Sequence, residues 1–432
     1  MPSLHTRLGF HYYPDDQHYT QVDLDTWLPV LQSLGARWIT LRASLERAVP
    51  EPFLRGLQEA GIEPVVHMPL GVTRLSEHEL APLLTSYARW GLRYVVCFDR
   101  PNLRSSWSPA DWSRPGLVER YLDVLLPVLQ AQRAAGLRPM LPPLEPGGDY
   151  WDTAFLAATF EALARRGQDS LLSETTLAIY AWTYHKPLTW GAGGPALWPE
   201  ARPYHTPEGA QDQRGLRTFD WYAAIARTAD IPNLPMIVIA GGELPAAGEA
   251  TIGPDAHVEQ NVGIARSLAS GDIPASVLNV AFYALATSEV HPDHFAAWFP
   301  KMQEPRPVVA AMRRLVESAP KGPAASIEKP IKHYLLLPPD RGPTFLQRWQ
   351  KLSEFTIAYH PAIGFSAEEA RLAQHVTIAA ETAEIPASVE TELRSAGCTV
   401  ERLVVADPET ASYPVAVGTL QATTAETGEC HA

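Results

Sequence analysis

The stretch Tyr94-Val95-Val96-Cys97-Phe98-Asp99-Arg100-Pro101-Asn102-Leu103 joins an apolar run to a polar turn. The run from Tyr94 to Phe98 is apolar or aromatic, as is typical of a buried β-strand. Pro101 has no backbone N–H to donate and cannot continue a strand inside a sheet. The stretch therefore predicts a strand over residues 93–98, with polar side chains at its carboxyl end.

Seven further apolar runs precede residue 290, and segments with helical periodicity separate them. The predicted strands are residues 8–13, 38–43, 64–69, 93–98, 138–144, 176–184, 235–240 and 276–285. Gly35, Gly61, Gly91 and Gly136 each follow a helical segment, as glycine does at helix ends. This alternation predicts a (β/α)8 TIM barrel. A doubly wound open sheet is the alternative, but no glycine-rich phosphate turn follows the first strand.

The composition changes to Ala, Pro, Ser and Lys between Glu317 and Pro330, which is typical of a linker. Beyond it, helical segments separate three apolar runs, at residues 334–337, 376–379 and 400–404, which predicts parallel strands. We expect a barrel over residues 1–316, a linker over 317–330, a small three-layer α/β domain with a short parallel sheet over 331–420, and a flexible tail over 421–432.

The 432 residues carry a formal net charge of −13. Nucleic acids and anionic membrane surfaces bind clustered Lys and Arg, so neither is expected as a partner. The three cysteines, Cys97, Cys398 and Cys430, are far apart, which favours neither a disulfide framework nor a zinc site. No metal or other cofactor is expected. No apolar run reaches about 18 residues and no signal-like segment opens the chain, so a cytoplasmic protein is expected.

The turn after residue 98 resembles the end of the fourth strand in the (β/α)8 retaining glycoside hydrolases. Their signature there is Asn-Glu-Pro, often followed by another Asn and soon by a Trp. Pro101 and Asn102 match this signature, and Trp107 follows, but Asp99 stands at the Asn and Arg100 at the catalytic Glu.

The same family has its nucleophilic Glu at the end of strand seven, in a Thr/Gly-Glu-x-Gly turn. Setting Gly242 on the family's glycine places Ala240 on the nucleophile. Arg42 fits the family's second-strand Arg, and His185 resembles its sixth-strand His or Tyr. The resemblance covers residues 8 to about 315. It implies a sugar site at the barrel mouth, in a pseudoenzyme that binds carbohydrate or serves in an assembly.

Side chains at the predicted strand ends would meet at the carboxyl end of the barrel. Aromatic rings there suit the C–H faces of sugars, and polar groups suit their hydroxyls. The residues expected to contact a sugar are His11, Arg42, His67, Arg100, Asn102, Trp107, Trp182, Tyr184 and His185.

Two other functions stay open. Retaining hydrolysis needs two carboxylates about 5 Å apart, and relocated acids drawn from Asp99, Glu145 and Glu243 would make the protein an active O-glycosyl hydrolase. The competing interpretation of these carboxylates is that they form ion pairs, for example with Arg100. A third possibility is a structural scaffold with a mouth filled by its own loops. The oligomeric state is left open.

Overall fold

The chain divides into two compact units, Met1–Gly322 and Pro323–Ala432. The structure, a computed structural model, describes residues 4–75, 77–244, 253–301, 304–318, 329, 331–338, 352–353, 355–357 and 359–403. No helix in these ranges is long and apolar enough to cross a membrane.

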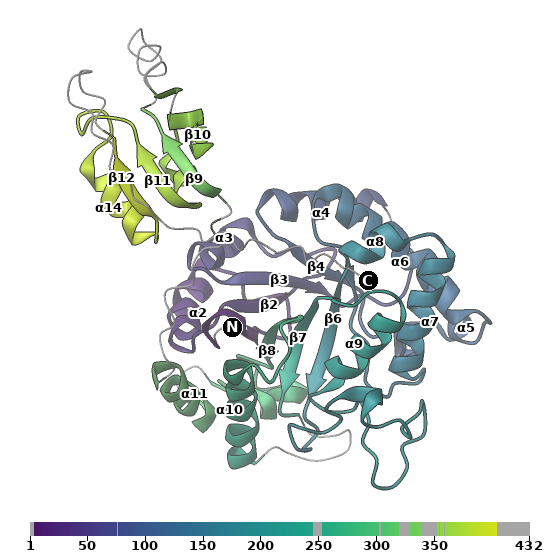
Figure 1. Cartoon of the computed structure of the whole chain (residues 1–432). Helices are drawn as coiled ribbons and strands as arrows, with labels where there is room; N and C mark the ends of the chain where they lie inside the picture. Colours follow the sequence, from purple (N-terminus) through teal and green to yellow (C-terminus); the bar gives the residue numbers. More distant parts are fainter. Residues whose placement is uncertain are drawn as a thin grey trace, which may run out of the picture. The chain divides into compact units, whose positions relative to one another are not determined.

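The first unit contains one eight-stranded parallel sheet in the order β4-β3-β2-β1-β8-β7-β6-β5 (Figure 1). The strands are β1 (Leu8–His11), β2 (Trp38–Arg42), β3 (Glu63–Met68), β4 (Tyr94–Cys97), β5 (Met140–Leu141), β6 (Thr176–Trp182), β7 (Met236–Gly242) and β8 (Val277–Phe282). A parallel bridge between Tyr94 and Arg138 connects the two edges beside β4 and β5. The predicted TIM barrel is confirmed.

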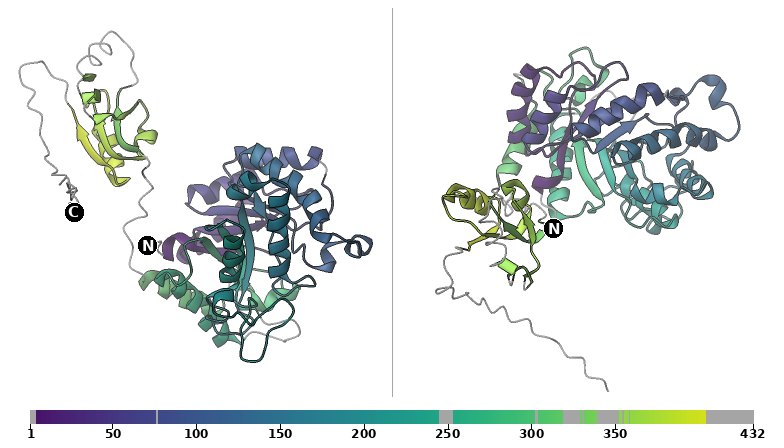
Figure 2. Two further views of the ribbon diagram at one scale, coloured as in Figure 1. Left: turned by 45° about the vertical axis from the view of Figure 1, so that its right-hand side comes forward. Right: turned by 90° about the horizontal axis from the view of Figure 1, so that it is seen from above.

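Helices form the outer layer of the barrel (Figure 2). The main ones are α2 (Gln21–Ser33), α3 (Glu51–Glu59), α4 (Glu77–Arg89), α6 (Leu117–Ala135), α7 (Asp152–Arg165), α9 (Thr218–Thr228), α10 (Pro254–Ser270) and α11 (Pro307–Ser318). Shorter ones are α1 (Leu4–Arg7), η1 (Arg104–Ser106), α5 (Pro109–Trp112), α8 (Asp169–Glu174), η2 (Gly194–Ala196) and η3 (Pro292–Ala296). Gly35 and Gly136, which follow α2 and α6, have φ of 70° and 88°, as expected of glycine at a helix end.

Successive side chains of each strand face opposite sides of the sheet. One face packs against the helices in the large apolar core, to which Leu41, Val66 and Val95 belong. The other face forms a separate cluster that fills the barrel: Val65, Tyr94, Val96, Met140, Ala178, Ile237 and Ile239, with Trp38, Tyr180 and Leu278 packed against it. Inward positions nearer the carboxyl ends of the strands therefore point into the barrel mouth.

The second unit contains a four-stranded parallel sheet in the order β10-β9-β11-β12. Its elements are β9 (Ile331–Leu336), β10 (Ala362–Gly364), α13 (Ala367–Ala370), β11 (Ala373–Ile378), α14 (Ala387–Ser395) and β12 (Thr399–Arg402). Tyr334 and Leu336 are buried on one face and Leu335 on the other, as in a three-layer domain. The three predicted strands are parallel as expected. The sequence interpretation missed β10, which has only three residues, and residue 404 lies outside the described ranges.

Candidate functional site

The turn after β4 aims Asp99 into the barrel mouth. Strict alternation after the inward-facing Val96 would turn Phe98 inward and Asp99 outward. Phe98 instead has φ of 70°, in the left-handed region, and its fully buried ring belongs to the outer core. Asp99 then accepts a 2.7 Å hydrogen bond from the hydroxyl of Tyr180, which projects from β6 into the barrel. The left-handed conformation of Phe98 thus interrupts the alternation of side chains, so Phe98 faces outward and Asp99 faces inward.

Arg100 connects two carboxylates at this edge of the mouth. Its Nε lies 3.0 Å from Oδ2 of Asp99 and its Nη1 lies 3.4 Å from Oε2 of Glu145, which follows β5. The guanidinium also lies 5.7 Å from the centre of the Tyr180 ring. Burial raises the pKa of Glu145, and the lowering effect of Arg100 does not cancel that increase.

Asn102 and Trp107 have structural roles in the same loop. The Asn102 side chain donates to the carbonyls of Glu145 and Tyr150 and accepts from the N–H of Glu145, each at 2.9 Å. It is 0% exposed, so its amide is used within the protein. The Trp107 indole donates to the Pro101 carbonyl, and its ring packs in the outer core. The structure does not present either predicted contact to the mouth.

Aromatic rings line the β6 and β8 side of the mouth. Trp182 stacks on Tyr180 at 5.7 Å between centroids and meets Tyr283 edge-on at 5.5 Å. Trp182 is only 7% exposed, whereas Tyr180, Tyr184 and Tyr283 are partly exposed. Sequence reasoning missed Tyr180 and Tyr283. The two-residue period of β6 would have revealed Tyr180, because it lies two positions before Trp182.

The end of β7 contains Ala240, the residue that the sequence resemblance aligns with the nucleophilic Glu of the retaining glycoside hydrolases. Ile179 pairs with Val238 but Tyr180 pairs with Ala240, so β7 contains one extra residue there. Ala240 consequently shares the inward face of Tyr180, and it is 2% exposed.

Glu243 lies one residue beyond Gly242, which pairs with the inward-facing Trp182. Glu243 is 2% exposed, and its carboxylate contacts the Thr183 hydroxyl and Nδ1 of His185. This carboxylate is buried between the ends of β6 and β7, and the side chain of His185, 33% exposed, covers it.

Three basic side chains point into the mouth from β1, β2 and β3: His11, Arg42 and His67. Nε2 of His67 lies 3.1 Å from the Phe98 carbonyl, which can only accept, so Nδ1 is left as an acceptor. Burial lowers the pKa of His67 to about 4. Burial, followed by the charge of Arg42, lowers the pKa of His11 well below its usual value. Both imidazoles are therefore neutral at neutral pH.

The mouth thus contains paired carboxylates, neutral imidazoles and partly exposed tyrosines, a set able to exchange hydrogen bonds with hydroxyl groups and to cover an apolar ring face. Within the described ranges, no group of three or more His, Cys, Asp or Glu is arranged to hold a metal ion.

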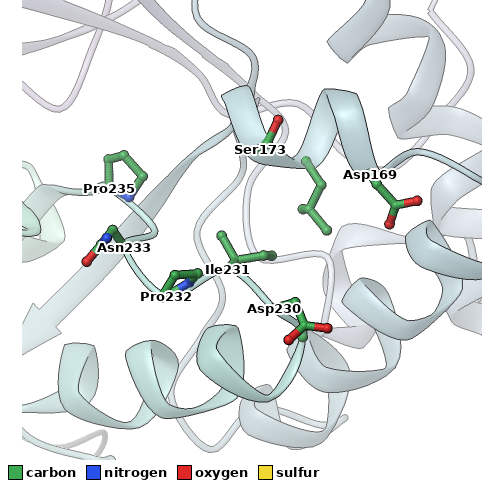
Figure 3. A pocket seen from close by; sticks show the side chains of 9 residues that line it. Asp169, Ser173, Asp230, Ile231, Pro232, Asn233 and Pro235 are labelled. Carbon is green, nitrogen blue, oxygen red and sulfur yellow. The ribbon is translucent and has the colours of Figure 1, made fainter. Parts of the chain in front are cut away.

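A separate cavity of about 500 Å³ lies at the other end of the barrel, before the starts of β6 and β7 (Figure 3). It is lined by Asp169, Leu172, Ser173, Ala229, Asp230, Ile231, Pro232, Asn233 and Pro235. Its position, away from the carboxyl ends of the strands, sets it apart from the predicted site.

No protein-family model matches the sequence, and no curated protein matches it either. Among solved structures, the chain is similar to a family 39 glycoside hydrolase from the gut symbiont Bacteroides cellulosilyticus WH2, with 13% identity and a TM-score of 0.50. That match covers 72% of this chain and 64% of the other, so the chain spans less than two thirds of that protein's length.

Two further solved structures match with lower TM-scores. An endo-β-1,3-glucanase of family 128 (subgroup II) from Sorangium cellulosum is 16% identical, with a TM-score of 0.44 over 73% of this chain and 98% of that one. A monomeric β-xylosidase from Caulobacter crescentus CB15 is 11% identical, with a TM-score of 0.45 over 73% and 68%. The family 39 likeness establishes a shared TIM-barrel fold.

Proposed function

We propose that the barrel binds a carbohydrate at its mouth and does not hydrolyse it by double displacement. The observation that carries this proposal is the position of Arg100, where the retaining glycoside hydrolases have their acid. Its guanidinium pairs with both Asp99 and Glu145. An arginine does not release its proton at working pH, so Arg100 cannot serve as the general acid at this position.

The arrangement at β7 supports the same conclusion. Ala240, on the inward face at the matching nucleophile position, cannot attack an anomeric carbon. Glu243 is the nearest carboxylate along the chain, but it is buried against Thr183 and His185. The partly exposed rings of Tyr180, Tyr184 and Tyr283 provide the surface that a sugar would contact.

Two measurements test the proposal on the full chain. A glycan array should identify carbohydrate ligands, and a panel of aryl glycosides should show no turnover above background. Tyr184→Ala should weaken binding of any glycan found by about 1–3 kcal/mol, the scale of one buried aromatic contact. As a control, Tyr150→Ala changes a ring that packs on Phe155 in the outer core. Turnover by the unmodified protein would refute the non-hydrolytic part, and an empty array would refute carbohydrate binding and favour a scaffold.

The raised pKa of Glu145 favours one alternative, an active glycosidase. A general acid must keep its proton near neutral pH, and burial moves the pKa of Glu145 in that direction. In this alternative, turnover of aryl glycosides would be detected and Glu145→Gln would abolish it. Turnover lost in Glu145→Gln but kept in a control variant, Glu174→Gln on α8, would establish the enzyme.

A further inference from the structure

We propose that the carbohydrate taken by this mouth is acidic, and that its carboxylate binds the guanidinium of Arg42. This inference rests on the proposed function, because it specifies the class of sugar that the same site would bind.

Arg42 is the last residue of β2 and continues the inward-facing series of Trp38 and Thr40. Its charge acts on His11, His67, Tyr180 and Tyr283, which belong to or follow β1, β3, β6 and β8. In the sheet Arg42 pairs with His67 of β3, and β2 lies between β1 and β3, so Arg42 lies beside both histidines on the inward face. Arg42 is partly buried, so water solvates it incompletely.

The described residues provide no ion-pair partner within 4.0 Å of Arg42, although the mouth is rich in carboxylates. Each of those carboxylates is already engaged. Asp99 and Glu145 pair with Arg100, Glu243 contacts His185, and Asp293 accepts a 2.6 Å hydrogen bond from the Tyr283 hydroxyl. Among the described residues of the mouth, no acid therefore balances the charge of the Arg42 guanidinium.

A second, independent feature lies beside it. His11 is 4% exposed, and its Nδ1 is buried without a hydrogen-bond partner in the described part of the chain. A buried polar atom without a partner costs free energy unless a ligand or water satisfies it. The pair of Arg42 and His11 Nδ1 suits a ligand that brings a charged acceptor together with a hydroxyl group.

The charge count favours a carboxylate. The planar guanidinium can form two parallel hydrogen bonds with the two oxygens of one carboxylate. A phosphate monoester carries nearly two negative charges and would need a second cation. The other guanidinium, that of Arg100, already serves two acids. A uronic acid residue supplies one negative charge and ring hydroxyls on the same molecule.

Calorimetric titration of the full chain tests the inference with matched oligosaccharides: oligogalacturonate, its methyl ester and the neutral galactose oligomer, and the corresponding glucuronate and glucose set. The free acids should bind about tenfold or more tightly than their esters and neutral counterparts, because only the free acid forms a charge-assisted hydrogen bond with the guanidinium. Added salt should reduce that preference.

Arg42→Gln should remove the preference for the acid and leave the weaker neutral binding in place. Arg42→Lys keeps the charge and should retain part of the preference, which separates lost charge from a misfolded barrel. Arg93→Gln is the matched control, because Arg93 pairs with Glu63 at the opposite end of the barrel.

Equal affinity for acids and esters, or an unchanged preference in Arg42→Gln, would overturn the inference while leaving carbohydrate binding intact. A preference for sulfated over carboxylated oligosaccharides would overturn the carboxylate assignment. If no oligosaccharide binds in the titrations or on the glycan array, the proposed function itself is refuted, and this inference with it.

Discussion

The Tyr180 hydroxyl donates a 2.7 Å hydrogen bond to Oδ1 of Asp99, joining two residues 81 positions apart. The bond passes over β5, which lies between β4 and β6, and fixes the turn after β4 to the barrel interior. Oδ2 of the same carboxylate is paired with Arg100 at 3.0 Å. Asp99 therefore has partners on both oxygens, a tyrosine from one strand and an arginine from its own turn.

Tyr180→Phe removes the hydroxyl and leaves Oδ1 of Asp99 without this donor in a half-buried site. We expect a loss of about 1–3 kcal/mol in the free energy of unfolding, as for a charged acceptor that loses its partner. Chemical denaturation measures it. Tyr150→Phe is the control, because the Tyr150 hydroxyl has no hydrogen-bond partner in the described part of the chain. Equal effects in the two variants would show that the bond to Asp99 does not stabilise the turn.

The double variant Arg100→Glu with Ala240→Glu should create a retaining pair of carboxylates. Ala240 shares the inward face of Tyr180, whose hydroxyl reaches the turn that carries Arg100. We expect the two new side chains to face each other at roughly the 5 Å separation of retaining enzymes. Aryl glycoside turnover should appear in the double variant and in neither single variant. A folded double variant without turnover would show that the two positions are not aligned for catalysis.

Asp152 should make stability depend on pH. It is 0% exposed and accepts hydrogen bonds from Gly147, Gln213 and Tyr222. Burial raises its pKa from 3.8 to about 6. The folded state therefore holds the proton more tightly than the unfolded chain, and its contribution to stability is present below pH 4 and lost as the pH rises through 6.

Asp152→Asn should remove that dependence, because the amide cannot titrate and the Tyr222 hydroxyl can turn to accept from it. The shift corresponds to roughly 3 kcal/mol between pH 4 and pH 7. Urea denaturation of both proteins across this range gives the difference, which cancels titrations common to both. A difference that is flat with pH would show that Asp152 titrates normally in the folded protein.

Gly9 should not tolerate a side chain. A Cβ there would lie 2.8 Å from Cβ of Trp38, on the adjacent strand inside the barrel. Gly9→Ala should therefore lower the melting temperature, with a cost of about 1–3 kcal/mol for overpacking. Gly253→Ala, at the start of α10, meets nothing within 4 Å and should be close to neutral. Similar stability of the two variants would show that Trp38 can move aside.

The boundary between the units remains a prediction from the sequence. The Pro-, Ala- and Ser-rich composition between Glu317 and Pro330 predicts that limited proteolysis cleaves there first. Mass spectrometry of the fragments would locate the cleavage. First cleavage within the barrel strands would contradict a linker.

The sequence by itself determined the barrel. Alternating apolar runs and glycine-ended helices are short-range patterns, and a few consecutive residues encode each of them. The same period of two determined which strand-end side chains would point inward, as Arg42 and His67 do. The strands β9, β11 and β12 of the second unit could be predicted because each is a local apolar run. The three residues of β10 are too few to show such a pattern.

Only the tertiary structure decided which side chains point into the mouth and which of them contact one another. The direction of Asp99 depends on the positive φ of Phe98, and the position of Ala240 depends on the extra residue in β7. The Trp107 ring packs in the outer core and under the guanidinium of Arg120, which belongs to a different segment of the chain. That Arg42 has no ion-pair partner among the described residues also depends on tertiary structure, because Asp99, Glu145 and Glu243 contact other side chains. Contacts such as that of Tyr180 with Asp99 join residues 81 positions apart, and positive φ values and extra strand residues interrupt the regular period, so local periodicity carries no information about either.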